Sequence, residues 1–83
     1  MTNDMSITSK SLALFLAYAR DAGNWSGTPL IGGNVGGDVE GRGNLTQLKR
    51  AGLIRTLTAE GNAFIYFTGS GRALAASHGI RLD

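Results

Sequence analysis

The sequence predicts a small α+β domain made of helices and one β-hairpin. Two segments of the 83-residue chain, 9–22 and 38–52, repeat apolar residues at the three- and four-residue spacings of an amphipathic helix. Two later segments, 54–58 and 63–68, are rich in β-branched and aromatic residues and flank a turn-forming stretch. A chain of this length supports one core of modest size, so residues 1–83 are expected to form a single domain.

The composition excludes several classes of protein. Hydrophobic residues make up 42% of the chain and charged residues 17%, a balance that is typical of globular domains and argues against disorder. There is no cysteine, which excludes disulfides, thiolate zinc sites and cysteine nucleophiles. One histidine and scattered acids do not converge on a site, so we expect no enzyme, no metal and no cofactor. No apolar segment approaches the about 20 residues that a membrane helix needs, and we expect a cytoplasmic protein.

Charge is distributed unevenly along the chain. The formal net charge is +2, but residues 1–41 carry two basic and four acidic side chains, whereas residues 42–83 carry six basic and two acidic ones. A basic half beside an acidic half can orient a protein on a polyanion. The same distribution also describes ordinary solvated charge, so it favours a nucleic-acid partner without identifying one.

The first helix is expected over residues 9–22, after a loose polar start at residues 1–8. Gly23 follows it and is predicted to end the helix, because glycine adopts the left-handed conformation at little cost. Apolar residues at helical spacing form one face of this helix, namely Leu12, Phe15, Leu16 and Ala19.

The same segment has a second interpretation as a secretory signal. Lys10 precedes a mostly apolar stretch that ends in the pattern Ala17-Tyr18-Ala19, which resembles a cleavage site. Cleavage there would remove the strongest helix of a short chain. The amphipathic period explains the residues without cleavage, and we therefore favour the helix.

Residues 23–43 are unusually rich in glycine, with eight glycines among 21 residues. They contain neither GK[ST] nor a G-x-G-x-x-G motif between a strand and a helix, so tight turns and close backbone contacts are favoured over a phosphate-binding loop. Thr28 and Pro29 are suited to begin a short helix. Trp25 and Ile31 are equally suited to flank a short strand, and both interpretations remain open.

A second helix is expected to begin at Asp38, as its N-cap, and to end at Gly52. Glu40 lies in the first turn, where an acid favours the helix dipole. Leu45 and Leu48 share the face that we expect to be buried. At 100° per residue the opposite face collects Gly43, Thr46, Gln47 and Arg50.

A hairpin is expected over residues 54–68, with its turn near residues 59–62. Alternation places Ile65 and Phe67 toward the core and leaves Phe64 and Tyr66 against another element. The three aromatic residues also suggest a stacking platform of the kind found in proteins that bind single strands.

A last helix is expected over residues 69–79, capped by Thr68 and ended by Gly79. Leu74 and Ala75 are predicted to face the core. His78 is the only histidine, and with no cysteine and no clustered acids it lacks partners for a metal site. It is therefore expected to act as a cation at the C-terminal end of this helix.

The order of these segments resembles the winged helix-turn-helix domain of bacterial and phage transcription regulators, with the MarR-like and PadR-like families nearest. The recognition helix of these families ends in L-x-x-L-x-x-x-G-L-I, which residues 45–54 match at Leu45, Leu48, Gly52, Leu53 and Ile54. The helix after their wing often begins with T-x-x-G, here Thr68 to Gly71. The resemblance covers residues 38–79. It departs at residues 23–37, where the family has a regular second helix.

The resemblance implies a helix, a glycine-rich segment, a recognition helix at 38–52, a two-stranded wing at 54–68 and a helix at 69–79. It also implies binding of double-stranded DNA, because a helix fits the major groove and reads its base edges. Arg50 is suited to guanine, Gln47 to adenine, and Thr46 to a thymine methyl or a phosphate. Gly43 would allow close approach to the sugar-phosphate wall. Candidates for phosphate contacts are Arg42, Lys49, Arg55 and Asn62.

Other interpretations of these residues are kept. The same side chains are those of the solvated face of an ordinary amphipathic helix. Trp25 is suited to stack on a base, although a lone tryptophan beside a glycine-rich turn is more typical of the core. The predicted wing tip, Glu60-Gly61-Asn62, is not basic, which favours a winged helix that binds a protein, for example a small phage-encoded inhibitor that docks on a host protein.

The sequence thus favours a small DNA-binding transcription regulator from a phage or another mobile element. Proteins of this shape commonly bind two half-sites as dimers. A homodimer is therefore expected to use either the helix at 69–79 or the first helix as its interface.

Overall fold

Three α-helices and one antiparallel hairpin make up the described part of the chain. The structure is a computed structural model that describes residues 7–25, 27–32, 35 and 39–82. The expected N-cap Asp38, and most of the expected loose start, lie outside the described residues. The elements are α1 (Ser9–Asp21), the 3₁₀ helix η1 (Ala22–Trp25), α2 (Val39–Arg50), β1 (Ile54–Ala59), β2 (Asn62–Phe67) and α3 (Gly69–Ser77).

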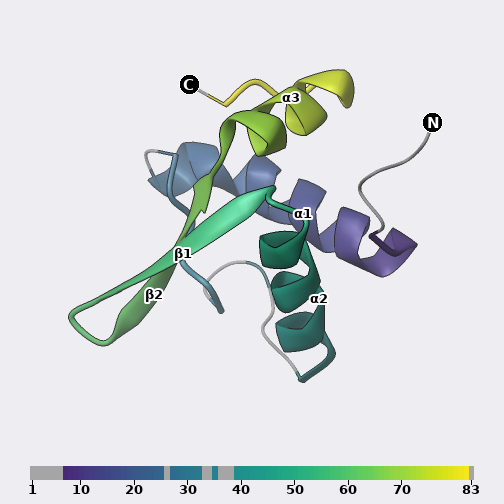
Figure 1. Ribbon diagram of the computed structural model, residues 1–83. Helices are drawn as coiled ribbons and strands as arrows, with labels where there is room; N and C mark the ends of the chain where they lie inside the picture. Colours follow the sequence, from purple (N-terminus) through teal and green to yellow (C-terminus); the bar gives the residue numbers. More distant parts are fainter. Residues whose placement is uncertain (1–6, 26, 33–34, 36–38, 83) are drawn as a thin grey trace.

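The helices surround the base of the hairpin (Figure 1). In this view α1 crosses the middle, α3 lies above it, α2 lies below it, and the hairpin runs outward to a tip at the lower left. Helix α2 packs mainly on α1, and α3 packs on β2. The prediction of a small α+β domain is therefore confirmed at the level of its elements.

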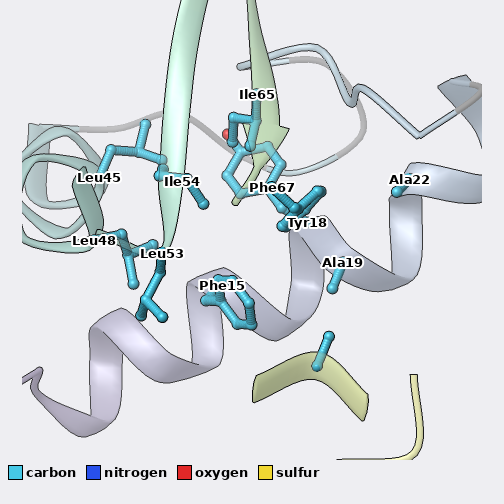
Figure 2. Close-up of a cluster of buried hydrophobic side chains, with 11 residues drawn as sticks. Phe15, Tyr18, Ala19, Ala22, Leu45, Leu48, Leu53, Ile54, Ile65 and Phe67 are labelled. Atoms are coloured by element: carbon cyan, nitrogen blue, oxygen red, sulfur yellow. The ribbon is translucent and has the colours of Figure 1, made fainter. Parts of the chain in front are cut away.

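A single core joins all of these elements (Figure 2). Phe15 of α1 and Phe67 of β2 meet edge to face, with ring centroids 5.6 Å apart and an interplanar angle of 80°. This geometry is favourable because the positive edge of one ring meets the negative face of the other. The remaining core residues are Tyr18, Ala19, Ala22, Leu45, Leu48, Leu53, Ile54, Ile65 and Ala75.

Helix α1 begins as its sequence predicts, but it ends differently. The Thr8 hydroxyl caps it by accepting a hydrogen bond of 3.1 Å from the Ser11 N–H. At the other end the chain tightens into η1, so the prediction that Gly23 ends the helix in the left-handed conformation is wrong. Gly27 takes that conformation instead, with φ 94°, and its N–H donates to the Ala22 carbonyl at 2.8 Å.

Residues 29–31 of the glycine-rich segment pair with the hairpin and are not helical. Leu30 makes an antiparallel bridge with Phe64. The Ile31 N–H donates to the Ala63 carbonyl at 2.8 Å, and the Ile65 N–H donates to the Pro29 carbonyl at 3.0 Å. The helix beginning at Thr28-Pro29 is therefore wrong, and of the expected short strand the structure has only the isolated bridge at Leu30. Two hydrogen bonds to the free edge of β2 satisfy backbone groups that one helical turn would leave unpaired.

Helix α2 ends at Arg50, two residues before the predicted bound, and Gly52 stops it in a Schellman motif, as its predicted role requires. Gly52 has φ 77°, its N–H donates to the Lys49 carbonyl at 3.0 Å, and the Leu53 N–H donates to the Leu48 carbonyl at 3.1 Å. These bonds satisfy carbonyls that have no partner within the helix. The predicted buried face is also confirmed, because Leu45 and Leu48 lie in the core.

The hairpin closes through a turn of two residues. Glu60 and Gly61 have φ of 53° and 83°, which is the type I′ geometry that matches the twist of paired strands. The strands are one residue longer at the turn than predicted, because Ala59 pairs with Asn62. Ile65 and Phe67 face the core, as expected. Tyr66 is 42% exposed, so the expectation that it packs against another element is wrong.

Helix α3 also agrees with its predicted caps. The Thr68 hydroxyl accepts a hydrogen bond from the Gly71 N–H at 3.0 Å, and Gly79 adopts φ 80° after the last turn. Ala75 is buried and Leu74 is half-buried, as predicted. His78 is the C-cap residue and is exposed, which places it where a cation favours the dipole of the helix.

The first turn of α3 lies against the backbone that joins α2 to β1. A Cβ atom added at Gly71 would lie 2.1 Å from the Leu53 carbonyl oxygen. Backbone atoms at that position cannot move aside without disturbing the hairpin. The glycine of the T-x-x-G motif is therefore required by this close approach.

We predict that Gly71→Ala lowers the free energy of unfolding by about 1–3 kcal/mol, the usual cost of forcing an extra methyl group into a packed site. Gly69→Ala is the matched control, because it adds the same methyl to the same helical turn where no atom lies within 4 Å. Urea denaturation of both variants measures the difference. An equal effect of the two substitutions would contradict the close approach at Gly71.

Candidate nucleic-acid interface

The residues that the sequence predicts to bind DNA lie on α2 and on the hairpin. Helix α2 buries Leu45 and Leu48 and turns its other side to solvent. Five of the nominated residues on this helix are exposed and one, Gln47, is half-buried: Arg42, Gly43, Thr46, Gln47, Lys49 and Arg50. The other two, Arg55 and Asn62, are exposed on the hairpin.

The cations of α2 are available for a partner. Arg42, Lys49 and Arg50 are exposed, and none of them forms an ion pair with another residue of the described part of the chain. Long basic side chains of this kind reach phosphate groups without loss of an existing partner. The arrangement supplies three positive charges within nine residues of one helix.

Thr46 and Gln47 are more constrained than the sequence suggests. The Thr46 hydroxyl donates to the Arg42 carbonyl at 3.1 Å, so its methyl group and lone pairs remain for a partner. The Gln47 Oε1 atom accepts a hydrogen bond of 2.7 Å from the Thr8 N–H. A bidentate contact with adenine needs both the oxygen and the nitrogen of the amide. Gln47 would therefore have to release Thr8 to make it.

A polar seam, formed by Thr8, Ser11, Asn44 and Gln47, joins α1 to α2 and was not predicted from the sequence. Thr8 meets Gln47, and the buried Ser11 hydroxyl donates to the Asn44 Oδ1 atom at 3.1 Å. Each helix thus contributes two residues that are three positions apart, the spacing that places side chains on one face. This spacing is the signal that could have identified the seam.

Gly43 lies in the middle of α2 with open space around it. A Cβ atom added there would have no atom within 4 Å apart from the helix itself, and its φ is not positive. The fold therefore does not require glycine at this position. The absence of a side chain at Gly43 would allow a partner to approach the backbone of α2 closely, and the structure is consistent with this reason for the glycine.

Arg55 and Asn62 lie on the face of the hairpin that is turned away from the core. Arg55 pairs with Tyr66, and Asn62 pairs with Ala59 beside the turn. Paired residues of an antiparallel ladder share a face, opposite to the one that carries Ile54 and Phe67. The structure thus separates the nominated residues into a cationic helix face and a smaller group on the hairpin.

Trp25 is held beside α1 rather than in the core. Its indole N–H donates to the Asp21 Oδ2 atom at 2.8 Å, and the Asn24 side chain donates to the Oδ1 atom at 2.9 Å. The ring is half-buried and lies outside the core cluster, so the expectation that it fills the core is wrong. The carboxylate fixes the indole, which leaves little freedom for stacking on a base.

A third group of cations lies at the other end of the molecule. Two adjoining open grooves of ≈ 480 and ≈ 440 Å³ flank the final described residues, between α3 and the end of α1. Arg72 and Arg81 line the first groove, and Arg20 and Arg81 line the second. In Figure 1 this end of the chain lies beside α3, across α1 from α2.

The described residues offer neither a metal-binding cluster nor a membrane-spanning helix. No cluster of three His, Asp or Glu side chains stands close enough there to hold a metal ion. No helix in this part of the chain has the length and apolar character needed to cross a membrane.

Comparison with models of known protein families, with curated proteins and with solved structures found no match to this chain.

We predict that Gly43→Ala raises the free energy of unfolding by up to about 1 kcal/mol, because alanine is the better helix former at an open position. Gly52→Ala, at φ 77°, is the matched control and should lower it by more than about 1 kcal/mol. Urea denaturation measures both. A loss of stability in Gly43→Ala would contradict the open helical position described above.

Proposed function

We propose that this protein is a small cytoplasmic transcription regulator of the winged helix-turn-helix type, which binds double-stranded DNA through α2. The observation that carries the proposal is the exposed face of α2, with three exposed cations that have no ion-pair partner among the described side chains, on a helix whose other face is buried in the core. The element order, with a hairpin directly after this helix and a capped helix after the hairpin, supports the same proposal.

Within this proposal the residues divide by the part of DNA that they contact. Arg42, Lys49 and Arg55 neutralise phosphates, which sets the register of the protein on the duplex without reading its sequence. Arg50 reads a guanine through its planar pair of donors. Gly43 lets the helix backbone approach the groove wall, and Thr46 contributes its methyl group or an accepting lone pair.

The three phosphate contacts of Arg42, Lys49 and Arg55 should make the affinity for any duplex sensitive to salt. Each neutralised phosphate contributes a slope of about −0.9 to log K against log [salt], so three contacts weaken binding about 40-fold between 50 and 200 mM. Fluorescence anisotropy of a labelled mixed-sequence duplex measures this slope. We expect the triple variant Arg42/Lys49/Arg50→Ala to lose the binding.

The matched control removes three charges from the other end of the molecule. Arg20/Arg72/Arg81→Ala changes the net charge equally but leaves α2 intact, so it should retain duplex binding. If both triple variants lost the same duplex affinity, the interaction would depend only on net charge, which would contradict a specific role of α2. Circular dichroism confirms that both variants are folded.

A second function is favoured by one observation, the acidic tip of the hairpin. Glu60 is exposed at the turn, where a DNA-binding wing usually carries a basic residue. A winged helix that docks on a protein would tolerate this acid. Such a contact would depend little on salt and largely on apolar area, so absence of duplex binding at 50 mM salt would favour it.

Reading of a base by Arg50 has its own test. On a duplex obtained by site selection we expect Arg50→Ala to cost about 1–3 kcal/mol, and clearly less on random duplex. Lys49→Ala, which removes a neighbouring charge, should weaken binding to both duplexes alike. Anisotropy titrations of the two variants on the two duplexes give the four values. Equal losses for Arg50→Ala on both would exclude base reading.

A further inference from the structure

The hairpin has a second face, of which the DNA-binding proposal uses only Arg55. Its inner face contributes Ile54, Ile65 and Phe67 to the core. Side chains alternate along a strand and paired residues share a face, so the register assigns the remaining positions to the outer side. The outer face consists of Arg55, Leu57, Ala59, Asn62, Phe64 and Tyr66.

Two strands and one isolated bridge contribute to this outer face. Leu57 of β1 pairs with Phe64 of β2, and Phe64 pairs on its other edge with Leu30. The bonds from Ile31 to Ala63 and from Ile65 to Pro29 flank this second pair, which makes it the non-hydrogen-bonded kind with the closer side chains. Leu30, Phe64 and Leu57 therefore form one row across the sheet.

This row is not an extension of the core. Leu30, Leu57, Phe64 and Tyr66 are absent both from the core cluster and from the partly buried residues that pack against it. Leu57 is 48% exposed and Tyr66 is 42% exposed, and they are the large hydrophobic side chains that stand exposed in the described part of the chain. An apolar and aromatic face of this kind marks a binding surface.

Arg55 identifies the chemistry that fits this face. It lies directly opposite Tyr66 in the register, so a basic and an exposed aromatic residue are cross-strand neighbours on one face. The acidic residue nearest to it in the hairpin is Glu60, which is at the turn and not among the paired residues. Two copies of this face would bring their Arg55 side chains together without a paired carboxylate, whereas a polyanion supplies the missing charge.

The spacing of the rings suits the bases of an extended strand. Phe64 and Tyr66 are two positions apart on β2, which is about 6.8 Å along a strand. Proteins that bind unpaired nucleotides combine aromatic rings on a sheet with a nearby cation, because every base has a π-face and every nucleotide has a phosphate. A double helix offers no such base faces, since its bases are stacked on one another.

We propose that the outer face of the hairpin binds unpaired nucleotides of a single-stranded nucleic acid. Tyr66 stacks on one base, Phe64 with Leu30 and Leu57 supplies the apolar floor for the next, and Arg55 holds a phosphate or stacks on a base. This site shares Arg55 with the duplex proposal, but its aromatic rings lie apart from the cationic face of α2 and do not depend on duplex binding there.

The test compares a labelled mixed-sequence 12-nucleotide single strand with the duplex of the same sequence, by fluorescence anisotropy at 50 mM salt. We expect Tyr66→Leu to weaken binding of the single strand on the order of 5- to 100-fold, the usual loss of one stacked base. Leucine keeps the apolar character and size, so the hairpin should remain folded. Tyr66→Phe is the matched control and should retain binding, because it keeps the ring.

Duplex binding separates the two proposals. Tyr66→Leu should leave duplex binding unchanged, while Arg42/Lys49/Arg50→Ala should abolish it. Failure of one proposed site can therefore be distinguished from failure of the other. Three results would overturn the single-strand site. They are no binding of the single strand by the unmodified protein, equal affinity of Tyr66→Leu and Tyr66→Phe, and an equal loss of single-strand and duplex binding in Tyr66→Leu. The first of these results would favour a protein partner for the outer face.

Discussion

The hydroxyl group of Thr68 joins the ends of three elements at one point. It lies 2.6 Å from the Gly52 carbonyl oxygen and 3.1 Å from that of Leu53, and it accepts the Gly71 N–H at 3.0 Å. The Thr68 N–H also donates to the Leu53 carbonyl at 3.1 Å. The end of α2, the base of the hairpin and the start of α3 therefore meet at a single residue. The start of β1 and the end of β2 lie side by side next to Leu53. The backbone of Leu53 therefore holds both strands and the first turn of α3 in place.

This junction also determines how α2 is presented. Its C-terminal end is held by the Schellman motif at Gly52, and its buried stripe lies in the core with Phe15 of α1. The bonds of Gln47 with Thr8 and of Asn44 with Ser11 hold the same helix along its polar side. A helix fixed by its end, its apolar stripe and a polar seam presents its exposed cations with little loss of conformational entropy, which favours binding.

Features of the fold with local causes were predictable from the sequence, and those with distant causes were not. Helical spacing identified the buried stripe of α2, and Thr68 and Gly79 identified both ends of α3, because caps act within one turn. The pairing of Leu30 with Phe64 depends on the free edge of β2, which lies more than thirty positions away in the chain. The hydrogen bond between Gln47 and Thr8 was not predictable for the same reason, because the two residues are 39 positions apart in the chain. Alternation gave the two faces of the hairpin correctly, but it carries no information on which neighbours cover Tyr66.

The two surfaces proposed to bind nucleic acid differ in the physical origin of their affinity. Helix α2 offers three unpaired cations and no aromatic ring among its described side chains, so its free energy of binding comes from phosphates and falls steeply with salt. The outer face of the hairpin offers two aromatic rings and one cation, Arg55, so its free energy of binding comes mainly from stacking. One phosphate contact to a single strand contributes a slope of only about −0.7 to log K against log [salt]. Under the two proposals, rising salt therefore weakens duplex binding to α2 more steeply than single-strand binding to the hairpin. Only three residues link α2 to β1, so under the same proposals one molecule would hold a duplex close to an unpaired strand.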